Sequence, residues 1–138
     1  MSFLDNIMKK VGAFLATNYG QVVSGEYAGC RIAFGCPPKT KMKSPYDYSQ
    51  IIFLKDNEEM ARLNIGTDLI NVEFVEVIQF PATGRDGYRC KLTYGDGETC
   101  EADLFPSKVR AIYMVLRFVM LEKTKEFFEK EVEKLPQA

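Results

Sequence analysis

The sequence of 138 residues contains no histidine and no tryptophan. Histidine is the commonest general base, so its absence excludes a Ser-His or Cys-His nucleophile pair. Neighbouring carboxylates such as Glu58 and Glu59, or Asp96 and Glu98, lie at predicted turns, where solvation explains them. We therefore predict a non-enzymatic protein without a cofactor. The alternative is a small enzyme that uses carboxylates and tyrosines on the concave face of a sheet.

Closely spaced cysteine pairs are also missing. Cys30 and Cys36 are six residues apart, and Cys90 and Cys100 are ten apart, whereas strong zinc motifs place two cysteines within a few residues of each other. Without histidine, a zinc site would need all four thiolates. We therefore predict no metal site, and we expect the cysteines to be reduced, small core residues.

The chain has little net charge and no long apolar run. A net charge of −1 argues against a protein that binds nucleic acid through bulk charge. No apolar run approaches the roughly 20 residues of a membrane-spanning helix. Charged residues, including Asp5, interrupt the first 20 residues, unlike a signal peptide. We expect a cytoplasmic protein, with residues 1–138 forming a single domain.

The most apolar stretch is residues 109–121, VRAIYMVLRFVML, in which Arg110 and Arg117 are the only charges. A helix that is apolar almost all round must be covered on several sides. Pro106 ends the preceding sheet, and the pattern predicts one C-terminal helix over residues 107–134. At 1.5 Å per residue this helix would be about 40 Å long.

Residues 1–19 are predicted to form an additional amphipathic helix, which packs on the domain or a partner subunit, or else lies in the plane of a membrane. The C-terminal helix carries a second narrow stripe. Spacings of three and four residues are typical of a seam between two helices. We therefore expect these helices to meet within one chain or across a dimer. The predicted contact residues are Ile7, Val11, Phe14, Leu121, Phe128 and Val132.

Residues 21–105 have the pattern of antiparallel strands. We predict a strand over residues 26–34 bent at Gly29, and a strand over residues 50–55 that is apolar on both faces. Residues 58–65 are compatible with a helix or with the second strand of a hairpin. A long strand is predicted over residues 68–80, with a bulge near residues 74–76. Its predicted inner face comprises Ile70, Val72, Phe74, Ile78 and Phe80, with Val75 and Val77 facing the other way.

Residues 88–104 predict a hairpin whose three-residue loop is Gly95-Asp96-Gly97, with Gly97 in the left-handed conformation. The expected register pairs Tyr94 with Glu98, Leu92 with Cys100, and Cys90 with Ala102. This register places all the apolar side chains on one face, whereas a shift by one residue would turn one strand over.

A proline-rich loop over residues 35–49 carries the only basic cluster outside the helices. Lysines at alternate positions suit an anionic headgroup or phosphate, and nearby tyrosines add apolar and stacking surface. The simpler explanation is a solvated loop whose lysines aid solubility. The candidate ligand-binding residues are Lys39, Lys41, Lys43, Tyr46 and Tyr48.

The strand pattern IIFLKDNEEMARLNIGTDLINVEFVEV, followed by YRCKLTYGDGETCEADL and an apolar helix, resembles bacterial pleckstrin-homology-like domains. Asp68 and Ile70 match the polar residue and the isoleucine that begin the longer strand of that pattern. The resemblance covers about residues 25–121 and rests on residue types. It implies a strongly bent antiparallel sheet or small barrel that binds lipids, peptides or proteins.

We therefore expect an α+β fold in which a bent antiparallel sheet or small barrel packs on a long C-terminal helix, with an extra N-terminal helix. The leading functional expectation is an interaction domain that binds a protein or peptide partner and associates with itself through its helices. The second is a peripheral binder of anionic lipid or phosphate through the lysine loop. We expect no nucleic-acid partner.

Overall fold

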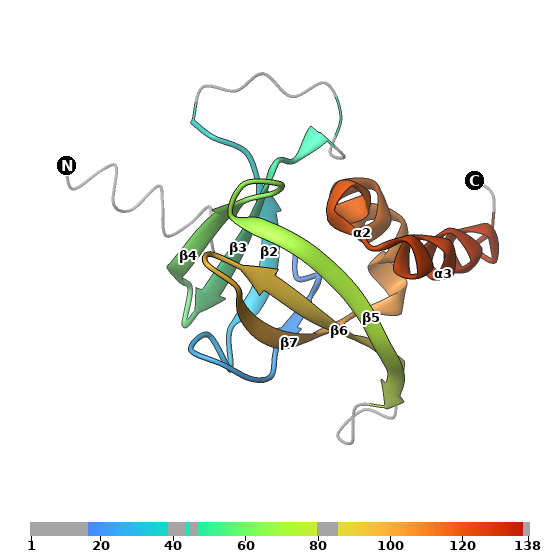
Figure 1. Ribbon diagram of the computed structural model, residues 1–138, viewed down its shortest axis with the longest axis horizontal. Coiled ribbons are helices and arrows are strands. Elements are labelled where there is room, and N and C mark those ends of the chain that lie inside the picture. Colours follow the sequence, from blue (N-terminus) through green and yellow to red (C-terminus); the bar gives the residue numbers. More distant parts are fainter. Residues whose placement is uncertain (1–16, 39–43, 45–46, 80–85, 137–138) are drawn as a thin grey trace.

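The chain folds into a seven-stranded antiparallel sheet and a C-terminal helical region (Figure 1). This computed structural model describes residues 17–38, 44, 47–79 and 86–136. The α+β class predicted from the sequence is therefore confirmed. The strand order is β4-β3-β2-β1-β7-β6-β5. The strands are β1 (Gly20–Val22), β2 (Arg31–Gly35), β3 (Gln50–Lys55), β4 (Glu58–Asn64), β5 (Leu69–Gln79), β6 (Asp86–Tyr94) and β7 (Glu98–Leu104).

The sheet is bent around one core and remains open. In Figure 1 strands β2, β3 and β4 stand upright, whereas β5, β6 and β7 cross the view diagonally. Side chains from both groups and from the helices form the same core cluster. The strands at the two ends of the sheet, β4 and β5, do not pair with each other as strands. An isolated bridge between Ile65 and Leu69 joins the chain after β4 to the start of β5. The expected alternative of a small closed barrel is therefore wrong.

The amino end of the described chain enters directly into the sheet. The amide of Tyr19 donates to the carbonyl of Ile32 over 2.9 Å, and residues 17–19 are not helical. The remainder of the predicted helix over residues 1–19 lies outside the described residues.

The predicted strand over residues 26–34 is wrong in its first half. Gly25 and Gly29 adopt positive φ angles of 82° and 92°, which favour glycine. The chain consequently turns between them, and β1 and β2 form an antiparallel pair in which Gly20 lies opposite Ile32. The two glycines mark a hairpin turn rather than a bend within one strand.

The hairpin of β3 and β4 decides between helix and strand for residues 58–64, which the sequence left undecided. Asp56 and Asn57 have φ angles of 51° and 66°, as a two-residue turn between twisted strands requires. Residues 58–64 therefore form a strand. As predicted, β3 is apolar on both faces: Ile51 and Phe53 lie in the main core, and Ile52 and Leu54 form a second cluster with Ala33.

The hairpin of β6 and β7 has the predicted register. Cys90 lies opposite Ala102, Leu92 opposite Cys100, and Tyr94 opposite Glu98. Gly97 has a φ of 103°. The predicted apolar face is confirmed, since all of its side chains are buried.

Strand β5 contains the bulge predicted near residues 74–76 and a second irregularity between Leu69 and Asn71. Each extra residue reverses the alternation of faces. Leu69 is therefore fully buried while Ile70 is 39% exposed, and Val77 lies opposite the buried Tyr88 while Ile78 lies opposite Gly87. The predicted common face of Ile70, Val72, Phe74 and Ile78 is wrong for Ile70 and Ile78. Phe80 lies outside the described residues.

The predicted single helix over residues 107–134 is also wrong. Figure 1 shows α2 and α3 as separate helices. The chain forms η2 (Pro106–Lys108), α2 (Val109–Leu116) and η3 (Arg117–Val119), becomes extended at Met120 and Leu121, and then forms α3 (Glu122–Glu133). Met120 makes a parallel bridge with Val72. The helix is interrupted because this part of the chain contacts the edge of β5.

Candidate interaction surface

The break between α2 and α3 forms an elbow, which we define as residues 117–124. The elbow is fixed on β5 at two points. The amide of Leu121 donates to the carbonyl of Val72 over 3.3 Å. The Thr124 hydroxyl oxygen accepts from the amide of Phe74 over 2.8 Å, and Thr124 is only 3% exposed. The elbow is therefore held by the sheet and does not depend on helix propensity alone.

The elbow turns a large aromatic side chain into solvent. Phe118 is 76% exposed, while its neighbours Val119 and Met120 are buried. The guanidinium of Arg117 lies 4.4 Å from the centroid of the Phe118 ring, and the same group donates to the carbonyl of Met114. Stacking and hydrogen bonding thus hold the arginine beside the exposed ring.

Two exposed aliphatic side chains lie on the same or the adjoining segment. Leu121 is 42% exposed on the elbow, and Ile70 is 39% exposed on β5. Because Met120 bridges Val72, the segments that carry Phe118 and Ile70 approach each other two residues before that bridge. We call Ile70, Arg117, Phe118 and Leu121 the elbow surface. Aromatic residues and arginine are enriched at binding hot spots.

The structure distributes the predicted contact residues unevenly. Leu121 belongs to the elbow surface, whereas Phe128 is fully buried and Val132 is half-buried against the core. Phe128 makes edge contacts with Phe74 and Tyr88, so its ring is used inside this chain. Ile7, Val11 and Phe14 lie outside the described residues.

The predicted ligand-binding residues are mostly outside the described chain. This applies to Lys39, Lys41, Lys43 and Tyr46. Tyr48 is half-buried and packs against the core. Its aromatic ring therefore packs on the core at the end of the segment over residues 35–49 that carries the lysines.

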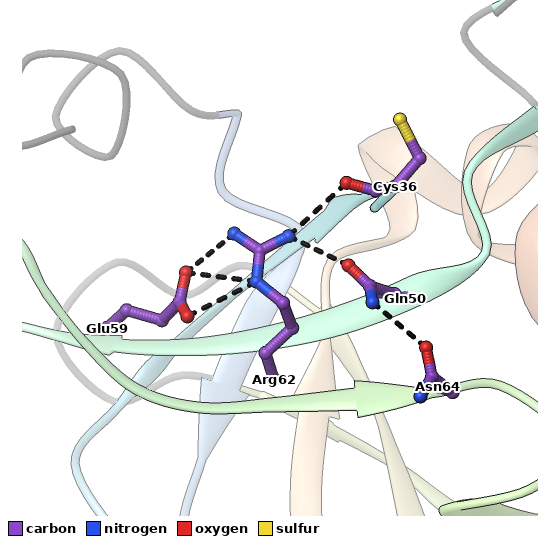
Figure 2. Close-up of polar contacts among 5 residues, drawn as sticks. All are labelled: Cys36, Gln50, Glu59, Arg62 and Asn64. Carbon is purple, nitrogen blue, oxygen red and sulfur yellow. Dashed lines mark hydrogen bonds and ion pairs between the residues drawn. The ribbon is translucent and has the colours of Figure 1, made fainter. Parts of the chain in front are cut away.

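A polar network lies beside the start of that segment (Figure 2). Arg62 donates to both carboxylate oxygens of Glu59 over 2.6–3.2 Å, to the side-chain oxygen of Gln50 over 2.8 Å, and to the carbonyl of Cys36 over 3.5 Å. Gln50 in turn donates to Asn64 over 2.9 Å. Each nitrogen of the guanidinium donates to a group of this chain, so the network joins β3, β4 and the chain after β2.

The buried titratable groups are poor candidates for catalysis. Burial raises the pKa of Cys90 to about 12 and that of Cys100 to about 11. Burial, together with the negative charge of Glu131, raises the pKa of Tyr88 to about 12. These groups are neutral at physiological pH, and a neutral thiol is a weak nucleophile.

In the part of the chain that the structure describes, cysteine and acidic side chains form no group of three or more that is placed to hold a metal ion. None of the described helices is long and apolar enough to cross a membrane.

No family model matches the chain, and no curated protein or solved structure is significantly similar to it.

The sequence interpretation included Leu121 but missed Phe118 and Ile70. Residues 109–121 were expected to be covered on several sides, which left no reason to expose one aromatic side chain. Arg110 and Arg117 are seven residues apart and mark the solvent side of the segment. The position of Phe118 next to Arg117 in the sequence was the one indication that the Phe118 side chain could be exposed.

Proposed function

We propose that the protein is a non-enzymatic interaction domain that binds a protein partner through the elbow surface. The observation that carries this proposal is the exposure of Phe118, which is 76%, on a segment that two hydrogen bonds hold on β5. A rigid aromatic anchor loses little conformational entropy on binding, and its burial contributes substantially to affinity.

Site-specific photo-crosslinking tests this proposal. A photoreactive phenylalanine analogue replaces Phe118 in the full chain, and a matched protein carries the analogue at Asp96, which is exposed in the turn between β6 and β7. We expect the protein with the analogue at position 118 to form a discrete covalent adduct with a partner protein, and the protein with the analogue at position 96 to form none. Absence of any adduct at position 118 would reject the elbow surface as a docking site. An adduct of twice the chain mass would identify a second copy as the partner.

A second candidate function is binding of anionic lipid or phosphate groups by Lys39, Lys41 and Lys43. What favours it is that both ends of their segment are fixed. The amide of Ser49 donates to the carbonyl of Gly35 over 2.9 Å, and Arg62 donates to the carbonyl of Cys36.

Sedimentation with anionic liposomes at low and high salt separates the two functions. The intact protein and a variant with all three lysines changed to alanine are compared. Salt-sensitive pelleting that the triple variant loses would favour lipid binding, whereas no pelleting would leave the elbow surface as the binding site.

A further inference from the structure

The outer edge of β5 is covered along only part of its length. Its first half is covered by the elbow, through the bonds that Val72 and Phe74 make with Leu121 and Thr124. β5 is the last strand of the sheet, and no other strand of the described chain pairs with its outer edge. The half that follows the bulge is therefore open to an additional strand.

The direction of the backbone groups follows from the pairing. Val72 and Phe74 direct a carbonyl and an amide, respectively, toward the outer edge. The bulge inserts one residue, so the outward-pointing residues beyond it are Val77 and Gln79. Within the described residues, nothing hydrogen-bonds to the backbone of Val77 or Gln79 on that side. An unpaired row of donors and acceptors is a template for another strand.

The side chains on the outer face of the sheet alternate in charge from strand to strand. Glu76 of β5 lies opposite Arg89 of β6, and Arg89 lies opposite Asp103 of β7. The guanidinium of Arg89 donates to both carboxylate oxygens of Asp103, at 2.8 and 3.0 Å. A neighbouring row repeats the order acidic, basic, acidic with Glu73, Lys91 and Glu101.

This alternation sets the charge that an added strand should carry. Opposite charges across neighbouring strands stabilise a sheet, and like charges destabilise it. Because β5 contributes an exposed glutamate at its free edge, a basic side chain opposite Glu76 continues the pattern. On the other face Val77 is 51% exposed, which suits an apolar neighbour. The favoured segment therefore alternates basic and apolar residues.

We propose that the open edge of β5 at Val77 and Gln79 binds an extended segment of a partner protein by strand addition, and that this segment alternates basic with apolar side chains. The proposal rests on the proposed function in assuming that the domain binds other proteins. The site is separate from the elbow surface, so each can be tested without the other.

Two labelled peptides of nine residues test the proposal by fluorescence anisotropy with the full chain. One alternates valine with lysine, and the other alternates valine with glutamate. We expect the lysine peptide to bind about tenfold more tightly than the glutamate peptide, because the two differ in the sign of the cross-strand charge pair. Amide hydrogen exchange should slow at Val77 and Gln79 when the lysine peptide is added.

Charge reversal on the protein provides the matched comparison. Glu76→Lys should reverse the preference between the peptides. Glu98→Lys makes the same change in net charge at an exposed position on β7, and should preserve the preference for the lysine peptide. Phe118→Ser should leave peptide affinity unchanged, which distinguishes this site from the elbow surface.

The proposal would be overturned by no saturable binding, by equal binding of both peptides, by equal effects of the two charge reversals, or by protection outside the β5 edge. Protection of Val77 that rises with protein concentration in the absence of peptide would show that a second copy occupies the edge, and would also overturn it.

Discussion

Phe118 and Phe128 are ten residues apart in the C-terminal region, yet Phe118 is 76% exposed and Phe128 is fully buried. Phe128 projects from α3 into an aromatic cluster with Phe74, Tyr88 and Phe127. Phe118 projects from the elbow, where the guanidinium of Arg117 lies over its ring. The same side chain thus stabilises the fold at one position and is available for binding at the other. Substitutions should separate these two roles.

The largest effect is expected at the buried ring. Phe128→Ala should lower the free energy of unfolding by about 3–5 kcal/mol, because it removes apolar contacts and leaves a cavity. Urea denaturation measures the change. Phe127→Ala is the comparison. Phe127 stacks on Phe74 with 3.9 Å between the ring centroids but is only half-buried, so this substitution should lower the free energy of unfolding by less. A loss below 1 kcal/mol for Phe128→Ala would contradict its role in the core.

The attachment of the elbow should contribute next. Thr124→Val keeps the shape of the side chain but leaves the amide of Phe74 without its acceptor, which should cost about 1–3 kcal/mol. Thr124→Ser retains the hydroxyl and should cost less. Faster amide exchange at Phe74 in the valine variant, and not in the serine variant, would locate the effect. Equal losses for both variants would show that the hydrogen bond is not the cause.

Buried groups should also make stability depend on alkaline pH. Burial raises the pKa of Cys90 and Cys100 from an ordinary value of 9.0 to about 12 and about 11, so the unfolded chain releases these protons first. Stability should be constant below about pH 8, begin to fall as pH approaches 9, and fall by about 1 kcal/mol per thiol between pH 9 and 10. Above pH 10, Tyr88 adds to the fall, since its folded pKa is about 12.

Urea denaturation under reducing conditions from pH 7 to 11 measures this dependence. Cys90→Ala should make the fall between pH 9 and 10 shallower, whatever its effect at pH 7. A slope unchanged by this substitution would contradict the assignment to the buried thiol.

The smallest effect on stability is expected at the exposed ring. Phe118→Ala should change the free energy of unfolding by less than about 0.5 kcal/mol, as is usual for surface positions. Thermal unfolding measures this change beside that of Phe128→Ala. A loss above 1 kcal/mol would show that contacts such as that with Arg117 use the Phe118 ring to stabilise the fold.

Several elements could be predicted because local chemistry determines them. Gly97 supplies the left-handed residue of the β6–β7 loop, and only one register of this hairpin buries Cys90 and Leu92 with Cys100. The bulge in β5 was indicated by Glu76, which interrupts an apolar face. These predictions depended on neighbouring residues and on the alternation of side chains along a strand.

Elements that depend on distant contacts were missed. The helix was predicted to continue through Met120 because nothing in residues 107–134 forbids it, but Val72 and Thr124 hold that part of the chain on the edge of β5. Similarly, Leu69 replaced Ile70 in the core because the second irregularity in β5 shifted the faces.

The sequence by itself determined the α+β class, the β6–β7 hairpin and the apolar character of residues 109–121. Only the tertiary structure decided which apolar side chains remain exposed. From the sequence, Phe118 belonged to a stretch expected to be covered, and Phe128 was predicted to contact another helix. Periodicity identifies the apolar face of a helix but does not show what covers it. The break at Met120, caused by residues about 50 positions earlier in the chain, turned one ring outward and left the other inside.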